Sequence, residues 1–185
     1  MLDFTSLRPL AVCSASLMSR RLIAGLIAAG LGAMLGFLLW PLFPVLEIVD
    51  GHGGRVVFCA RVQPGEEFVL SYVHSVNRRP VYDTLRMGAD HLVIAKSRFD
   101  TFGAGMPEAS TQDGTLTIAE DGWLEWTVNR PTPEITVRVG RVADHTVHCK
   151  GRDIRLSGLA EPGSALTLRV RKSRWLDLMK NRCIP

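Results

Sequence analysis

An uncharged run of 19 residues, from Leu22 to Trp40, limits what this chain can fold into more than any other feature of its sequence. An α-helix rises about 1.5 Å per residue, so a helix of this length nearly crosses a hydrocarbon core of about 30 Å. Pro41 and Pro44 end or kink such a helix, and Trp40 suits the interface between lipid and water. We therefore predict one transmembrane helix within residues 22–46, preceded by a segment of residues 1–21.

The charges that flank this run predict its orientation. Arg20 and Arg21 precede it, whereas Glu47 and Asp50 follow it. The positive-inside rule then places the N-terminus in the cytoplasm and residues 47–185 in the periplasm, on the outer side of the inner membrane. The alternative is a cleaved signal peptide and export of the remainder. The apolar run is long, and Trp-Pro-Leu-Phe-Pro after it is a poor cleavage sequence, so we favour an uncleaved single-pass anchor.

The distribution of charge argues against nucleic acid as a partner. The formal net charge is +4, yet residues 47–165 hold 13 Lys and Arg against 16 Asp and Glu. A nucleic-acid-binding domain normally carries its basic charge as a patch on the folded domain. Here the basic residues lie near the two ends, including the short tail of residues 173–185. This tail either rests on anionic lipid headgroups as a short helix or packs on the domain, and we favour the second.

From residue 47 onward, apolar and polar residues alternate with a period of two, which predicts short β-strands separated by Gly- and Pro-containing turns. No segment of this region shows a long helical period. Residues 47–172 are therefore expected to form an all-β domain, an antiparallel β-sandwich or partly open barrel. The candidate strands are residues 55–62, 67–74, 80–87, 92–99, 115–119, 123–128, 134–140, 145–149 and 165–171.

Two hairpins can be given a register. In residues 115–128, a three-residue loop with Gly122 in the left-handed region pairs apolar residues with each other. In the hairpin closed by Asn77-Arg-Arg-Pro80, matching apolar residues across the strands brings His74 opposite Asp83. The expected pairs are Ile118 with Leu124, Leu116 with Trp126, Leu70 with Met87, Tyr72 with Leu85, and His74 with Asp83.

The predicted His74–Asp83 pair has several interpretations. A carboxylate beside an imidazole orients the ring and raises its pKa, as in a general base, a ligand contact or a pH-sensitive joint. The same arrangement is expected of a hydrogen-bonded polar pair with a purely structural role, and we favour that interpretation narrowly. Ser75 points to the other face of the strand, so these residues are not a Ser-His-Asp triad.

We predict no metal site, because His145 and Cys149 share one face of a strand while His148 points to the other. No cofactor is predicted either. Cys59 and Cys149 both lie in the expected exported domain, where disulfides form. The sequence allows either a disulfide between them or two unpaired thiols.

A glycine-rich loop, Phe99-Asp-Thr-Phe-Gly-Ala-Gly-Met-Pro-Glu, follows one candidate strand. Gly103 and Gly105 allow positive φ on either side of Ala104, so their N–H groups can form an anion-binding nest. The alternative is a tight crossover loop that lets two phenylalanines pack. Arg78, Arg79 and Arg98 are candidates for counter-charge in the first case.

Several motifs in this region resemble an uncharacterised family of bacterial envelope domains. They are Tyr72-x-His-Ser-Val, Pro80-Val-x-Asp83, Phe99-x-x-Phe-Gly-Ala-Gly-Met-Pro107, Gly140-Arg-Val-x-x-x-His145 and Leu156-x-x-Leu-Ala-x-Pro-Gly163. The family is encoded beside, or fused to, permeases of TRAP-type transporters of the TAXI class. It usually has Glu at the position of Asp83 and often Leu at that of Met106. The resemblance covers residues 47–172 and implies a transport-associated role without an established activity.

We therefore expect a membrane-anchored accessory domain of a TAXI-type carboxylate uptake system that contacts the permease or its substrate-binding protein. One alternative is a module that binds a small anion. Another is a hydrolase that uses His74 and Asp83, although no third catalytic group accompanies them, and we assign no catalytic residue. The candidate binding or docking residues are His74, Asp83, Arg78, Arg79, Phe102, Gly103, Ala104, Gly105 and His145.

Overall fold

The computed structural model describes residues 13–41, 43–174 and 183. The chain divides into two compact units, Met1–Trp40 and Pro41–Pro185. Most of the predicted tail, residues 175–182 and 184–185, lies outside the described residues, as does the segment of residues 1–12.

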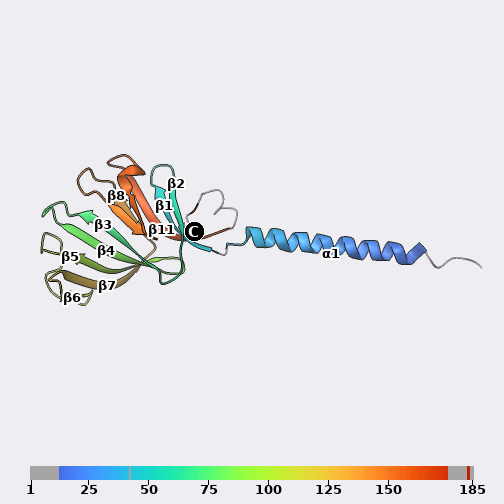
Figure 1. The fold of residues 1–185 in the computed structure, drawn as a ribbon, viewed down its shortest axis with the longest axis horizontal. Helices are drawn as coiled ribbons and strands as arrows, with labels where there is room; N and C mark the ends of the chain where they lie inside the picture. Colours follow the sequence, from blue (N-terminus) through green and yellow to red (C-terminus); the bar gives the residue numbers. More distant parts are fainter. Residues whose placement is uncertain (1–12, 42, 175–182, 184–185) are drawn as a thin grey trace, which may run out of the picture. The chain divides into compact units, whose positions relative to one another are not determined.

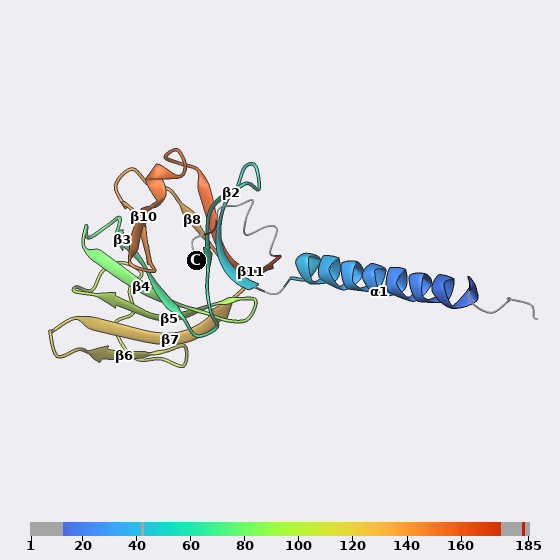
Figure 2. The same ribbon diagram turned by 45° about the vertical axis from the view of Figure 1, so that its right-hand side comes forward.

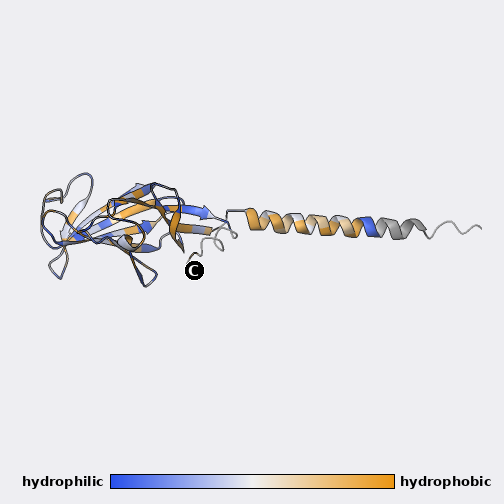
Figure 3. Ribbon diagram, turned by 90° about the horizontal axis from the view of Figure 1, so that it is seen from above, coloured by the Kyte–Doolittle hydropathy of each residue, from blue (hydrophilic) through white to orange (hydrophobic). Residues whose placement is uncertain are grey.

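The first unit contains one α-helix, α1 (Cys13–Leu39). Its Arg20–Leu39 stretch is long and apolar enough to cross a membrane. Figure 3 shows apolar residues along most of this stretch. A helix of this kind near the N-terminus is a signal anchor or a signal peptide. It ends at Leu39, just before Pro41, because the residue ahead of a proline is disfavoured in the α conformation.

The second unit consists of two antiparallel β-sheets, which confirms the predicted fold class (Figure 1, Figure 2). A 3₁₀ helix, η1 (Leu156–Gly158), lies between the last two strands. In spatial order the four-stranded sheet contains β2 (Val56–Arg61), β1 (Phe43–Asp50), β11 (Ala165–Ser173) and β8 (Glu134–Arg138). The seven-stranded sheet contains β10 (Arg152–Arg155), β9 (Thr146–Cys149), β3 (Glu67–Val73), β4 (Pro80–Met87), β5 (Leu92–Phe99), β7 (Leu124–Thr132) and β6 (Thr115–Ile118).

Two of these strands, β1 and β10, were not among the predicted ones. The prediction counted residues 43–46 as a continuation of the membrane segment, whereas they begin β1. Val45, Leu46 and Ile48 are fully buried, so β1 is apolar on both faces and lacks the alternation that identifies a half-buried strand.

A large apolar cluster, the main core, fills the space between the two sheets. Residues of both sheets and of η1 contribute to it, and each fully buried Leu or Ile stabilises the fold by about 1.5–3 kcal/mol. Its fully buried members are Leu46, Ile48, Val62, Leu85, Leu92, Val147, Leu156, Leu166 and Leu168.

The register predicted for the β6–β7 hairpin is confirmed. Leu116 lies opposite Trp126 and Ile118 opposite Leu124. Gly122 adopts φ +84°, the left-handed conformation that the three-residue loop requires.

The register predicted for the β3–β4 hairpin is wrong by four residues. Leu70 lies opposite Asp83, and Tyr72 lies opposite Val81, so His74 does not face Asp83. Instead, His74 closes the turn: its N–H donates to the carbonyl of Arg79 at 2.8 Å, and its carbonyl accepts from the N–H of Arg78. A slip of four keeps every side chain on the same face of the sheet, so alternation alone could not reveal it.

Neither of the two arrangements left open for Cys59 and Cys149, a bridge between them or two unpaired thiols, is found. Cys59 is bonded to Cys183, and Cys149 is a free, buried thiol. Cys59 lies opposite Glu47, on the face of the four-stranded sheet that points away from the main core, whereas Cys149 is part of that core. A disulfide fits an extracytoplasmic location.

Candidate functional site

The candidate site lies on the inner face of the seven-stranded sheet, beside the main core. Strand pairing sets Leu70, Asp83 and Ser97 in one row across β3, β4 and β5. Tyr72 lies two residues along β3 from Leu70, in the next row, with Val81 as its direct partner. Diagonal neighbours of this kind are within reach of a long aromatic side chain.

Asp83 is a half-buried carboxylate held by two hydroxyl groups. The Ser97 hydroxyl donates to its Oδ1 at 2.5 Å, and the Tyr72 hydroxyl donates to the same carboxylate. Burial raises the pKa of Asp83 above its ordinary value, and the two hydrogen bonds oppose this shift. The same burial, together with the charge of Asp83, raises the pKa of Tyr72 to about 12. Tyr72 is therefore a neutral donor at pH 7.

A second apolar group, the site cluster, borders this carboxylate through Tyr72. Its buried members are Val81, Phe99 and Leu124, which lie side by side on β4, β5 and β7. The partly buried side chains packed against them are Tyr72, Met106, Leu116 and Trp126. A carboxylate beside so much apolar surface is costly to ionise, which is the physical cause of its raised pKa.

The glycine-rich loop approaches this cluster through Met106. A hydrogen bond of 2.9 Å from the Met106 N–H to the Gly103 carbonyl closes a turn in which Gly105 has φ +82°. This is the position at which a type II turn requires positive φ. Gly103 is not in the left-handed region, so the expected nest with positive φ on both sides of Ala104 does not form.

Gly103 packs directly against the β3–β4 turn. A Cβ placed on Gly103 would lie 2.6 Å from Nδ2 of Asn77, so a larger residue requires movement of the Asn77 side chain. Arg79 reinforces the junction, because its Nε donates to Asp100 Oδ1 at 3.1 Å. The two sequence motifs that carry most of the candidate residues are therefore adjacent in the fold.

His145 brings a third motif to the same place. Its ring centroid lies 5.4 Å from that of Tyr72, and its Nδ1 is buried without a hydrogen-bond partner. Burial lowers the pKa of His145 below its ordinary value, so the ring is neutral at pH 7. The loop that carries it is joined to β3 by the hydrogen bond from the Val73 N–H to the Ala143 carbonyl, at 2.8 Å.

The other predicted site residues lie apart from Asp83. The Nδ1 atom of His74 accepts from the N–H of Val76 at 3.3 Å, within its own turn. Arg79 is paired with Asp100, and Arg78 is exposed at φ +57° in the same turn. Phe102 is 45% exposed and contacts Phe99 edge-on, with 6.3 Å between ring centroids.

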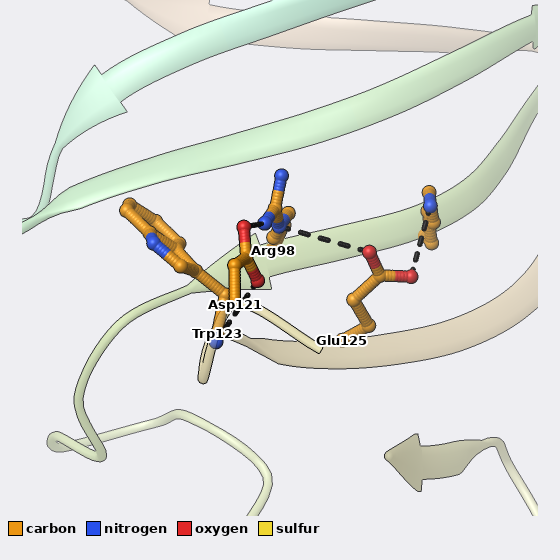
Figure 4. A network of polar contacts seen from close by, with 5 residues as sticks. Arg98, Asp121, Trp123 and Glu125 are labelled. Atoms are coloured by element: carbon orange, nitrogen blue, oxygen red, sulfur yellow. Dashed lines mark hydrogen bonds and ion pairs between the residues drawn. The ribbon is translucent and has the colours of Figure 1, made fainter. Parts of the chain in front are cut away.

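Arg98, expected as a counter-charge for the loop, belongs to the opposite face of the sheet. It pairs with Asp121 and lies 3.6 Å from Glu125, which also binds Lys96 at 2.9 Å (Figure 4). Its guanidinium lies 5.2 Å from the ring centroid of Trp123. Arg98 therefore pairs with carboxylates on its own face of the sheet and not with the glycine-rich loop.

The outer face also holds a group that the sequence did not predict. The Ser71 Oγ lies 2.7 Å from Nε2 of His148, and Nδ1 of the same ring lies 2.7 Å from Asp153 Oδ1. An imidazole held by a carboxylate on one nitrogen and facing a serine hydroxyl with the other has the geometry of a general base and its nucleophile. The period of two had placed His148 on the face opposite His145. Its partners depend on β9 pairing with β3 and β10, for which no local signal exists.

Among the residues that the structure describes, no group of three or more His, Cys, Asp or Glu side chains is arranged to hold a metal ion.

Comparison with known families identifies one match. Residues 68–156 match the model of a family described as "Domain of unknown function (DUF1850)". The chain is thus similar to this family over slightly less than half of its 185 residues. The matched segment runs from β3 to the first residue of η1, and it includes Tyr72, Asp83, Ser97, the glycine-rich loop and His145. The matched segment thus contains the whole candidate site. The curated proteins and the solved structures give no match to this chain.

Proposed function

We propose that the chain is a membrane-anchored periplasmic accessory domain of a TAXI-type TRAP uptake system, and that it docks on the permease. In this proposal α1 remains uncleaved in the inner membrane, with its N-terminus in the cytoplasm. The arginines before the apolar run, the resemblance of the motifs and the disulfide support it.

The observation that carries the proposal is a group of exposed apolar side chains on three adjoining loops, which we call the loop end. Val76 of the β3–β4 turn is 67% exposed, Phe102 of the glycine-rich loop 45%, and Val142 of the β8–β9 loop 52%. In the second unit, the described residues expose only two other large apolar side chains, Tyr82 and Ile118. Gathered apolar side chains with a polar surround are typical of a protein interface.

The site beneath these loops holds them in place. The Arg79–Asp100 ion pair, the contact of Gly103 with Asn77 and the ring contact of His145 with Tyr72 join the loops to one another and to β3. Loops fixed in this way lose little conformational entropy when they bind, which favours affinity. Asp83 and Tyr72 thus support a docking surface, and the permease is the partner that shares the membrane with the anchor.

Co-purification from detergent-solubilised membranes tests this function. A tagged TAXI permease co-expressed with the chain should retain the wild type, and Val76→Asp or Phe102→Asp should reduce the retained amount at least tenfold. Ile118→Asp is the matched control, because it places the same charge on an exposed apolar position of β6. Failure of the wild type to co-purify with the permease would overturn the proposal, and so would retention by the substrate-binding protein alone.

The Ser71–His148–Asp153 arrangement favours a second candidate function, hydrolysis of carboxylic esters. The Ser71 Oγ would bond to the acyl carbon while its proton passes to Nε2 of His148 and then to the departing alkoxide. Water, deprotonated by the same imidazole, would then release the carboxylic acid and restore the serine. Asp153 would hold the ring in the required tautomer.

Labelling with a fluorophosphonate probe, which forms an Oγ–P bond with loss of fluoride, tests this candidate. The wild type should be labelled, Ser71→Ala should not, and His148→Gln should react about 100-fold more slowly. Ser75→Ala, which removes an exposed hydroxyl from the β3–β4 turn, should leave the rate unchanged. Equal labelling of the wild type and Ser71→Ala would exclude hydrolysis through this serine.

A further inference from the structure

Four basic side chains gather at one end of the four-stranded sheet, the end at which β1 begins. Arg61 is the last residue of β2, and it lies in one row with Val45 and Arg171. Lys172 follows on β11, and Arg174 comes directly after that strand. We call these four residues the basic end.

No ion pair occupies any of these four cations among the residues that the structure describes, and all four are exposed. The neighbouring Arg169 differs, because it binds the buried Glu47 through its Nε and Nη2 atoms. The Arg61 guanidinium lies over the Phe43 ring, 4.4 Å from its centroid. An arginine on an aromatic ring keeps most of its N–H donors free for another acceptor.

The basic end borders a hollow of about 690 Å³. Asp90 is its one acidic lining residue, and its Oδ1 lies 3.0 Å from Nδ1 of His91. Three cations therefore face this hollow beside a single carboxylate, which contacts His91 and also interacts electrostatically with Lys172. The lining residues are Pro41, Asp90, Val170, Arg171, Lys172 and Arg174.

The length of chain between α1 and β1 limits how far the basic end can be from the membrane. Only residues 40–42 separate Leu39, the last helical residue, from Phe43, the first residue of β1. Four extended steps of the chain span about 14 Å at most. With α1 anchored in a bilayer, the start of β1 and its partners on β2 and β11 are thus confined near the headgroup layer.

We propose that the basic end binds the phosphate of anionic phospholipid headgroups. The inference rests on the proposed function in one respect, namely that α1 stays in the membrane. Arginine forks match two phosphate oxygens at once, and lysine adds a compact charge. Binding here would hold the domain against the lipid surface and fix the direction in which the loop end can meet a partner.

The proposal can be tested on the full chain in neutral detergent, with native mass spectrometry counting retained lipid. The probe is dihexanoyl-phosphatidylglycerol, and dihexanoyl-phosphatidylcholine and inorganic phosphate are the two comparison ligands. Each cation near an anionic lipid surface strengthens binding about fivefold at low salt. The variant Arg171→Gln/Lys172→Gln/Arg174→Gln should therefore bind phosphatidylglycerol about 100-fold more weakly than the wild type.

The matched control is Arg130→Gln/Arg138→Gln/Arg152→Gln, which removes three exposed cations from strands away from the basic end. It should retain wild-type binding, and both variants should melt within a few degrees of the wild type. Equal phosphatidylglycerol retention by the two variants would overturn the proposal, as would equal retention of phosphatidylcholine. Inorganic phosphate that binds the basic end while phosphatidylglycerol does not would overturn it too. Loss of permease co-purification leaves these lipid measurements unaffected, so the two proposals fail separately.

Discussion

The β-domain has two apolar clusters, and different elements cover them. The main core lies between two sheets, and every buried member of it is apolar. The site cluster is built from strands of the seven-stranded sheet alone, with Met106 of the glycine-rich loop packed on it, and it borders Asp83.

This difference shows where the fold can tolerate chemistry. The space between two packed sheets does not favour a charged group, because an unpaired buried charge would cost several kcal/mol. A loop closes its cluster less completely than a second sheet does and leaves water access at the rim. Loops also open locally at lower free energy than paired strands. The carboxylate borders the cluster that has this less regular closure.

The largest expected effect comes from the main core. Leu168→Ala removes a fully buried side chain from β11, so it should lower the free energy of unfolding by about 2–5 kcal/mol. Guanidinium denaturation followed by circular dichroism measures it. The control Ile118→Ala, at a position 74% exposed, should stay within about 0.5 kcal/mol of the wild type. Similar losses for the two variants would contradict the assignment of the core.

The disulfide should have the next largest effect. It joins residues separated by 124 positions, so in the chain-entropy model its removal costs up to about 4–5 kcal/mol of unfolding free energy. Cys59→Ser should lower the denaturation midpoint, and a reductant should lower that of the wild type equally. Alkylation without reduction should modify unfolded Cys149 and spare Cys59 and Cys183. Alkylated Cys183 in the unreduced wild type would contradict this pairing.

Asp83→Asn should change how stability depends on pH. The folded-state pKa of Asp83 lies above its ordinary value, so the folded protein binds this proton more tightly than the unfolded chain does. Wild-type stability therefore falls as pH rises from about 4 through the raised pKa, by about 1.4 kcal/mol for each pH unit that separates the folded-state pKa from the unfolded-state pKa.

Asn carries no such charge, so the stability of the variant relative to the wild type should increase as pH rises over this range. Denaturation midpoints at pH 4, 5.5 and 7 measure the gain. Ser97→Ala is the matched variant: it removes a hydrogen bond that lowers the Asp83 pKa, and should make the fall with pH larger. Parallel stability curves for the wild type and Asp83→Asn would show that the carboxylate is not perturbed.

The two hairpins show how much of this site the sequence could predict. In β6–β7, a three-residue loop with Gly122 allows one register, and the prediction is confirmed. In β3–β4, the loop is longer, and registers that differ by four residues place the same side chains on the inner face. Tyr72 and Asp83 were thus assigned to the correct face, but Asp83 was paired with the wrong partner.

The remaining differences arise from contacts distant in sequence. Ser97 meets Asp83, and Ser71 meets His148, only because β4 pairs with β5 and β3 with β9. Local patterns carry no information on the order of strands in a sheet. Cys59 could be assigned to Cys183 rather than Cys149 only once the faces of both sheets were known.

The smallest effect we expect is spectroscopic, and it tests the contact on which the site depends. The chain has two tyrosines, so in a Tyr82→Phe background the absorbance of phenolate at 295 nm reports Tyr72 alone. Its pKa should be about 12, because burial and then the negative charge of Asp83 disfavour the phenolate. Adding Asp83→Asn removes that charge and should lower the Tyr72 pKa. The rise in pKa that burial causes should remain. An unchanged Tyr72 titration would show that Tyr72 and Asp83 do not interact. The site cluster would then be a second apolar core with a carboxylate at its edge.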